Sequence, residues 1–141
     1  MGRRLQRLFA VRLRVQGASM EPGFREGSDV VLSPWHYLFN APARGDVVAV
    51  RRAERLDLKR IVGLPGERVS WNSGTIKING TALDEPYAMI PPPVPGDGEW
   101  RTVHLSRNEY FVAGDHRLYS TDSRRFGPVI RDAIVGKAIA S

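Results

Sequence analysis

Two short segments far apart in the chain carry a possible nucleophile and a possible unusual base. Ser19 lies in Gly17-Ala18-Ser19-Met20-Glu21-Pro22, and Lys59 lies in Leu58-Lys59-Arg60-Ile61-Val62-Gly63-Leu64-Pro65-Gly66. A serine hydroxyl becomes a good nucleophile when a neighbouring base removes its proton, and a lysine can do this only when it is neutral. An exposed lysine titrates near pH ~10.4, so neutrality near about pH 8 needs roughly 3 kcal/mol of desolvation. The pair indicates a Ser/Lys peptidase.

The neighbours of Lys59 decide whether its amine can be neutral. If residues 58–62 form a strand, the side chains alternate, so Lys59 shares a face with Asp57 and Ile61 while Arg60 points the other way. Ile61 helps to keep the amine neutral, whereas the Asp57 carboxylate favours the charged form. We therefore expect Asp57 to turn out to solvent.

A third segment completes the pattern. It reads Gly114-Asp115-His116-Arg117-Leu118-Tyr119-Ser120-Thr121-Asp122-Ser123-Arg124-Arg125-Phe126-Gly127-Pro128-Val129. With Arg44-Gly45-Asp46-Val47-Val48, four motifs occur in the order that is typical of type I signal peptidases, and the chain resembles this family from about Arg14 to the C-terminus. The order carries the resemblance, because a lone serine in a turn or a Lys-Arg pair in a strand is usually structural.

The resemblance implies a role for each matching residue. Ser19 would be the nucleophile and Lys59 the general base. The Ser120 hydroxyl would hold the lysine amine in place, and Asp122 and Arg124 would form a supporting ion pair.

The resemblance also implies an oxyanion site, in which the backbone N–H of Ser19 donates to the tetrahedral intermediate. Some relatives supply a second donor from a serine two positions before the nucleophile, where this chain has Gly17. The loss of one such donor can reduce the rate by ~10²-fold or more. Glycine at this position also permits a close backbone approach.

A preprotein or propeptide substrate would bind as an extended strand beside the serine and lysine segments, so that pockets for alternate side chains give specificity. By the resemblance, small residues are preferred at the first and third positions before the cut, an Ala-x-Ala pattern. The apolar residues that match pocket-lining positions are Leu13, Val15, Met20, Phe24, Val30 and Leu58. Each of them could equally fill a core. Phe24, in a position where the family usually has Leu, would narrow the first pocket.

Composition excludes several other kinds of site. A length of 141 residues, with 42% hydrophobic and 26% charged residues, indicates one globular domain. The chain has no cysteine, which excludes disulfides and thiol nucleophiles but leaves the compartment open. His36, His104 and His116 lack metal-ligand spacing, so we expect no metal and no cofactor.

The net charge of +6 is concentrated at the start of the chain. Five arginines precede the first acidic residue, Glu21, and leave about +1 for the rest. This pattern predicts a basic N-terminal arm over residues 1–13 that could contact a membrane surface, and no nucleic-acid partner. Signal peptidases normally carry a span of ~20 apolar residues, which this sequence lacks. The resemblance favours a membrane-associated site on the extracytoplasmic face, with a cytoplasmic location as the alternative.

The rest of the chain predicts a mainly β fold. Short β-branched runs separated by Gly, Pro, Asn and Asp occur at residues 13–15, 30–32, 47–50, 58–62, 68–71, 75–78, 110–112 and 134–139. They predict coiled antiparallel β-sheets of the signal-peptidase/LexA-like type with few short helices, one of them at residues 35–39. Asn79-Gly80 and Asn72-Ser73-Gly74 predict hairpin turns. Residues 14–141 then form one catalytic domain with a Pro-rich insertion loop at about residues 86–99.

Three functions are compatible with the sequence. The first is a serine endopeptidase that removes N-terminal signal peptides from exported preproteins. The second is a soluble maturation protease that trims the propeptide of one dedicated protein, as the nickel superoxide dismutase maturation proteases do. The third, a LexA-like regulatory or inactive peptide-binding module, is disfavoured because only 18 residues precede Ser19, too few for a DNA-binding domain.

Overall fold

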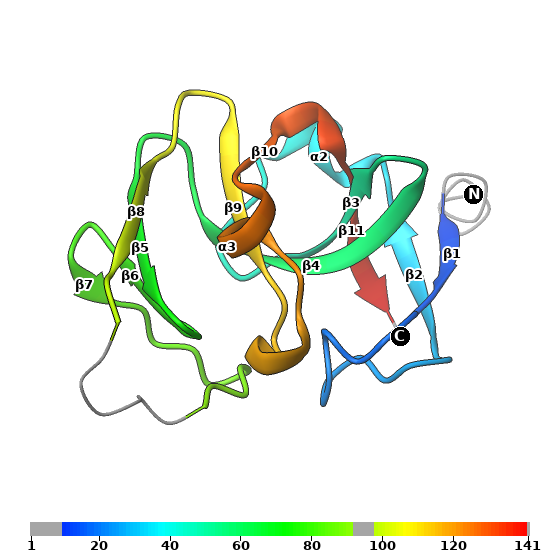
Figure 1. Ribbon diagram of the computed structural model, residues 1–141. Helices are drawn as coiled ribbons and strands as arrows, with labels where there is room; N and C mark the ends of the chain where they lie inside the picture. Colours follow the sequence, from blue (N-terminus) through cyan, green and yellow to red (C-terminus); the bar gives the residue numbers. More distant parts are fainter. Residues whose placement is uncertain (1–9, 92–97, 141) are drawn as a thin grey trace.

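The computed structural model describes residues 10–91 and 98–140, which form two antiparallel sheets (Figure 1). The larger sheet has seven strands in the order β1-β2-β11-β3-β4-β9-β10, with the bounds Val11–Arg14, Asp29–Ser33, Ile134–Ala140, Val47–Arg52, Arg55–Gly63, Glu109–Ala113 and Val129–Ile130. The smaller sheet has the order β7-β6-β5-β8, with the bounds Thr81–Ala82, Thr75–Ile78, Arg68–Asn72 and Arg101–His104. The predicted mainly β fold is confirmed.

In the described part of the chain the helices are few and short, as predicted. They are α2 (His36–Phe39), α3 (Ser123–Phe126) and the 3₁₀ turns η1 (Arg117–Tyr119) and η2 (Arg131–Ala133). Each predicted β run overlaps a strand, although β1 starts at Val11 and ends before Val15. The sequence pattern did not predict β7, β8 and β10. Two of these have only two residues each, and β8 is mostly exposed, so none has a strong apolar pattern.

Both predicted hairpin turns are present. Asn79 and Gly80 connect β6 to β7 with φ values of 51° and 86°, the left-handed pair typical of a type I′ turn. Ser73, with φ 53°, lies in the turn between β5 and β6. Ala53, with φ 51°, lies in the turn between β3 and β4, which the sequence did not signal.

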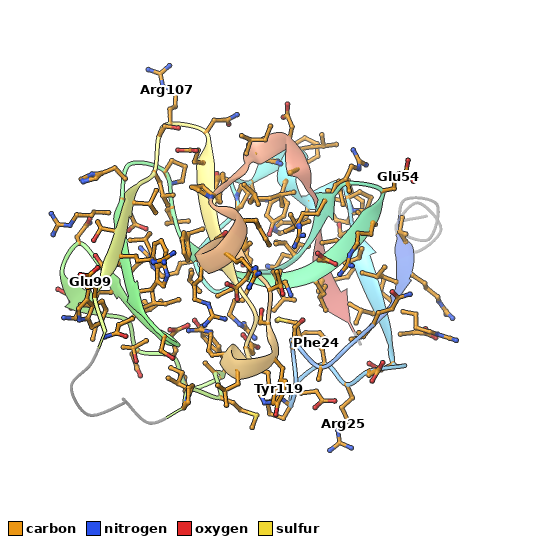
Figure 2. The ribbon with its side chains drawn as sticks, viewed as in Figure 1. Phe24, Arg25, Glu54, Glu99, Arg107 and Tyr119 are labelled. Atoms are coloured by element: carbon orange, nitrogen blue, oxygen red, sulfur yellow. The ribbon has the colours of Figure 1, made fainter. Side chains whose placement is uncertain are left out.

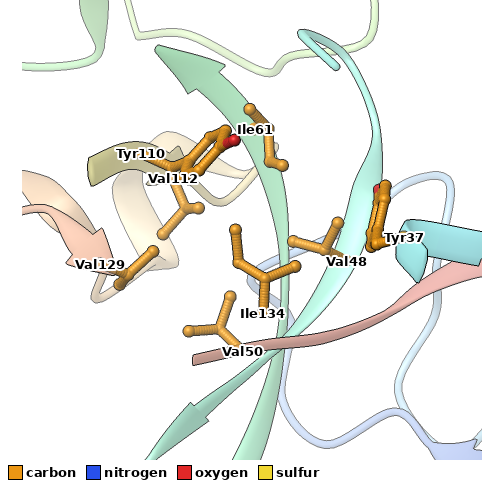
Figure 3. Close-up of a cluster of buried hydrophobic side chains, with 8 residues drawn as sticks. All are labelled: Tyr37, Val48, Val50, Ile61, Tyr110, Val112, Val129 and Ile134. Carbon is orange, nitrogen blue, oxygen red and sulfur yellow. The ribbon is translucent and has the colours of Figure 1, made fainter. Parts of the chain in front are cut away.

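Alternation along β4 places its side chains in two different environments. Ile61 packs in a buried cluster drawn in Figure 3, which comprises Tyr37, Val48, Val50, Ile61, Tyr110, Val112, Val129 and Ile134. Leu58 packs instead with Val15 and Met20 of the loop after β1 and with residues of β2 and β3. The face assignment made for Lys59 from the sequence therefore agrees with the structure.

The last strand joins the two parts of the larger sheet that carry the site. β11 pairs with β2 on one side and with β3 on the other. β1 and β2 form one antiparallel pair and β3 and β4 another, so β11 lies between the two pairs (Figure 1). The strands that flank the loop between β1 and β2 therefore belong to the same sheet as β4.

Parts of two predicted segments fall outside the described residues, namely residues 1–9 of the basic arm and residues 92–97 of the Pro-rich loop. Within residues 10–91 and 98–140, no helix has the length and apolar character needed to cross a membrane.

Candidate active site

Ser19 and Lys59 meet in the structure. Ser19 lies in the loop between β1 and β2, which Val15 closes by donating to the Ser28 carbonyl at 2.8 Å and which the buried Met20 side chain fixes to the core. Lys59 lies in β4, opposite Val48 of β3. The Lys59 Nζ donates to the Ser19 Oγ at 2.9 Å. The two groups are thus within direct proton-transfer distance.

The environment of Lys59 favours its neutral form. The residue is only 4% exposed, and this burial lowers the pKa of its amine from the ordinary lysine value. Asp57 and Asp122 act in the opposite direction, whereas the positive charges of Arg52 and Arg55 add to the lowering. A larger fraction of the amine is therefore available as a base near neutral pH than in an exposed lysine.

The expectation that Asp57 turns out to solvent is wrong. Its side chain is only 10% exposed, and it pairs with Arg55 at 2.8 Å and with Arg52 at 3.7 Å. The reason is the hairpin register, which sets Arg52 opposite Arg55 and Val50 opposite Asp57 on the same face. The carboxylate beside Lys59 is therefore counterbalanced by arginines rather than by water.

The predicted ion pair between Asp122 and Arg124 is formed. The Arg124 Nε and Nη2 atoms donate to the two carboxylate oxygens, each at 2.9 Å, and the Gly114 N–H donates to the same carboxylate. The Ser120 Oγ donates to Asp122 at 2.7 Å. Among the described side chains no hydrogen bond joins Ser120 to Lys59, so the role of Ser120 in holding the amine stays a prediction.

Gly114 lets the C-terminal motif pack directly on the loop of the nucleophile. A Cβ at this position would lie 2.1 Å from the Ser120 Oγ, 2.5 Å from the Ser120 Cβ and 2.7 Å from the Ser19 carbonyl oxygen. The next segment is tied to the same loop, because the His116 N–H donates to the Ser19 carbonyl at 2.9 Å. Only glycine fits between these groups.

Two buried ion pairs position this motif, and the sequence did not reveal them. Arg60 donates to both carboxylate oxygens of Asp115, at 2.9 and 2.7 Å, with its guanidinium 3.9 Å from the ring centre of Tyr87. Arg117 pairs with Glu85, and both side chains are almost fully inaccessible. The sequence shows Arg60 beside Lys59 and both Asp115 and Arg117 in the C-terminal motif, but nothing in the spacing identifies which acid pairs with which arginine.

A groove of about 200 Å³ runs past the Ser19 hydroxyl. One wall is residues 13–20, the other is residues 55–59, and Tyr119 and Thr121 close one side. The groove is lined by four of the six predicted pocket residues, namely Leu13, Val15, Met20 and Leu58. Within the described part of the chain, Val30 and Phe24 are absent from its lining and pack in or against the core cluster below it. Figure 2 shows Phe24 and Tyr119 at the same end of the molecule.

The backbone N–H of the nucleophile is available as a donor. The Ser19 N–H donates to no acceptor in the part of the chain that the structure describes. Gly17 has φ +78°, and a Cβ there would meet nothing within 4 Å. No described atom of the protein itself approaches Gly17 closely, so the close backbone approach stays a prediction for the bound substrate, and the left-handed φ by itself favours glycine here.

Comparison with known proteins adds the decisive observation. The family described as "Signal peptidase, peptidase S26" matches residues 5–141 of the chain. The chain belongs to the signal peptidase I family. It is therefore a serine endopeptidase, and the resemblance drawn from the sequence motifs is confirmed.

Several relatives of this signal peptidase are similar over most of its length. It is 33% identical over 134 residues to signal peptidase I V of Bacillus subtilis, covering 87% of this chain and 80% of the relative. It is 30% identical to signal peptidase IB of Staphylococcus aureus, covering 87% of this chain and 72% of the relative. The crystal structure of a signal peptidase I from Enterococcus faecalis matches with a TM-score of 0.58 and 29% identity, over 71% of this chain and 98% of that one.

No cluster of three or more His, Asp or Glu side chains that could hold a metal ion occurs within residues 10–91 and 98–140.

Proposed function

We propose that this signal peptidase removes N-terminal signal peptides from exported preproteins after an Ala-x-Ala-like site, with Ser19 as the nucleophile and Lys59 as the general base. The observation that carries the proposal is the 2.9 Å contact between the buried Lys59 Nζ and the Ser19 Oγ. The relatives named above all carry signal peptidase names, which favours preproteins over one dedicated propeptide as substrates.

The proposed reaction proceeds through an acyl-enzyme. The neutral Lys59 amine accepts the proton of the Ser19 hydroxyl as Oγ attacks the scissile carbonyl, and the Ser19 N–H donates to the developing oxyanion. The lysine ammonium then protonates the departing amine, which is the new N-terminus of the mature protein. Lys59 next accepts a proton from water, the hydroxide attacks the ester, and Ser19 leaves with that proton. The enzyme returns to its starting state.

The substrate would bind as an extended strand between the two walls of the groove. Residues 13–20 and 55–59 supply backbone groups on either side, and the apolar side chains of Leu13 and Leu58 line the space between them. The small volume of the groove, about 200 Å³, supports a preference for small side chains at the first and third positions before the cut.

We place the enzyme at the extracytoplasmic face of a membrane, where exported preproteins present their cleavage sites. Leu118 and Tyr119 of η1, next to the groove, are 66% and 67% exposed and are suited to the membrane interface. The basic residues at the start of the chain would add attraction to anionic lipid.

The proposal is tested with a peptide that carries an apolar run followed by an Ala-x-Ala site. Mass spectrometry after incubation with the wild type should show cleavage after the last Ala, and Ser19→Ala and Lys59→Ala should each abolish it. Lys77→Ala, in the smaller sheet, is the matched lysine control and should cleave normally. Cleavage that persists in Ser19→Ala would refute the proposed dyad. Failure of the wild type to cleave in detergent or lipid would favour a dedicated propeptide substrate.

A further inference from the structure

The turn end of the β3–β4 hairpin carries a cluster of three charged residues on the face of Lys59. Asp57 lies two residues before Lys59 in β4, and Arg55 lies two residues before Asp57. Arg52, at the end of β3, is paired with Arg55 in the strand register. Both arginines reach the Asp57 carboxylate, Arg55 at 2.8 Å and Arg52 at 3.7 Å.

The position of Arg52 is fixed from a second side. Its guanidinium lies 4.1 Å from the ring centre of Phe126 in α3, so it is held between an aromatic ring and the Asp57 carboxylate. Arg55 is more exposed, and its Nε also donates to Asp57 at 2.9 Å. The cluster is therefore a built arrangement that involves β3, β4 and α3.

An unpaired carboxylate at Asp57 would oppose the chemistry at Lys59. Residues two apart in a strand are separated by about 6.6 Å, which is close enough for a half-buried carboxylate to favour the ammonium form of a lysine. The two arginines contact the Asp57 carboxylate and compensate its negative charge. Arg124 does the same for Asp122, the other carboxylate that acts on Lys59.

We propose that Arg52 and Arg55 are positioning residues for catalysis that act through Asp57, by neutralising its carboxylate so that the Lys59 amine can serve as a base. This inference rests on the proposed role of Lys59. Among the described residues, the charged groups that act on Lys59 are Asp57 and Arg55 of β4, Arg52 of β3 and Asp122 before α3. Burial lowers the pKa of Lys59 most strongly, the two carboxylates raise it and the two arginines lower it.

The pH dependence of kcat/KM tests the inference, because the rate should rise as Lys59 loses its proton. Arg55→Gln should move this rise to higher pH and reduce the rate at about pH 7 by roughly threefold or more, equivalent to about half a pH unit. Asp57→Asn should move it to lower pH. The double variant Arg55→Gln/Asp57→Asn should lie close to Asp57→Asn, because Arg55 then has little carboxylate charge left to compensate.

Arg51→Gln is the matched control. Arg51 is an exposed arginine on the other face of β3, it is opposite Leu56 in the register, and it is not among the groups that act on Lys59. This variant makes the same change of charge in the same hairpin. The pH at the midpoint of the rise in kcat/KM should stay at its wild-type value. An equal shift in Arg51→Gln and Arg55→Gln would mean that net charge, rather than the cluster, sets the midpoint, and would overturn the inference.

A second readout is independent of cleavage. The chain has only three lysines, Lys59, Lys77 and Lys137, so the side-chain signals of ¹³C-labelled lysine can be assigned by substitution and followed by NMR during a pH titration. Lys59 should titrate at higher pH in Arg55→Gln and at lower pH in Asp57→Asn. An unchanged Lys59 titration in both folded variants would overturn the inference, even if the wild type cleaves preproteins. The expected titrations in a protein that does not cleave would count against the proposed function alone.

Discussion

Replacing Gly114 with alanine should inactivate the enzyme by displacing the nucleophile, although Gly114 takes no part in the chemistry. The added Cβ would lie 2.5 Å from the Ser120 Cβ and 2.7 Å from the Ser19 carbonyl oxygen. Ordinary contact begins at 3.4 Å, so these atoms must move away by about 0.9 and 0.7 Å. The Ser120 hydroxyl can rotate, but the Ser120 Cβ and the Ser19 backbone move only with their loops.

The magnitude follows from these displacements. A misplacement of about 1 Å at a reacting group can reduce the rate by about 10²-fold, and overpacking of this kind costs about 1–3 kcal/mol of stability. The backbone of Gly114 is not in the left-handed region, so conformational strain adds nothing further. We expect kcat/KM to fall by about two orders of magnitude and Tm to fall by roughly 4 °C per kcal/mol lost.

The assay is peptide cleavage by the folded variant, together with thermal unfolding followed by circular dichroism. Gly23→Ala is the matched control, since Gly23 lies in the same loop as Ser19, also has no left-handed φ, and would place its Cβ in open space. It should retain normal cleavage. A Gly114→Ala enzyme with kcat/KM within about threefold of the wild type would refute the reasoning, because the loops would then have absorbed the Cβ without moving Ser19.

Substitutions at three further sites test the buried charges and the loop of the nucleophile. Burial alone raises the pKa of Asp122, but Arg124 and other donors bring this pKa below the ordinary value. The ionised carboxylate therefore stabilises the folded protein above about pH 4, and this contribution disappears as the pH falls through the folded-state pKa. Thermal unfolding between about pH 7 and pH 2 should therefore show a smaller acid-induced loss of Tm in Asp122→Asn than in the wild type. Arg117→Met leaves Glu85 buried and unpaired and should cost about 3–5 kcal/mol in urea unfolding, whereas Arg117→Met/Glu85→Leu should recover most of it. Gly17→Ser should lower the free energy of unfolding by about 1–2 kcal/mol, because the backbone at residue 17 has a left-handed φ. Gly17→Asn should lower it less, and an equal loss in the two variants would show that the left-handed φ is not the cause.

The sequence was sufficient for most of the local structure of this protein. Every predicted β run overlaps a strand because β-branched residues are concentrated there, and Asn79-Gly80 forms the expected turn because both residues tolerate positive φ. The short strands β7 and β10 were missed, since two residues carry no period. Strand pairing rather than composition defines them.

The site was predictable only in part, for a related reason. The order of the motifs identified Ser19 and Lys59, which the structure brings into contact. The environment of Asp57 depends on the register between β3 and β4, which places its arginine partners beside it. The sequence does not give this register, so the expectation of a solvent-facing carboxylate was wrong. The Arg60–Asp115 pair joins residues 55 positions apart, and no local pattern connects them.

The position of β11 between β2 and β3 has a consequence during synthesis of the protein. The strand pair that flanks the Ser19 loop is synthesised before the pair that carries Lys59. β11 is the last described strand to emerge, and it is the one that hydrogen-bonds to both pairs. A nascent chain that has not yet received β11 lacks the strand that fixes the base to the nucleophile. We therefore expect proteolytic activity only after β11 has been synthesised and has paired with both β2 and β3.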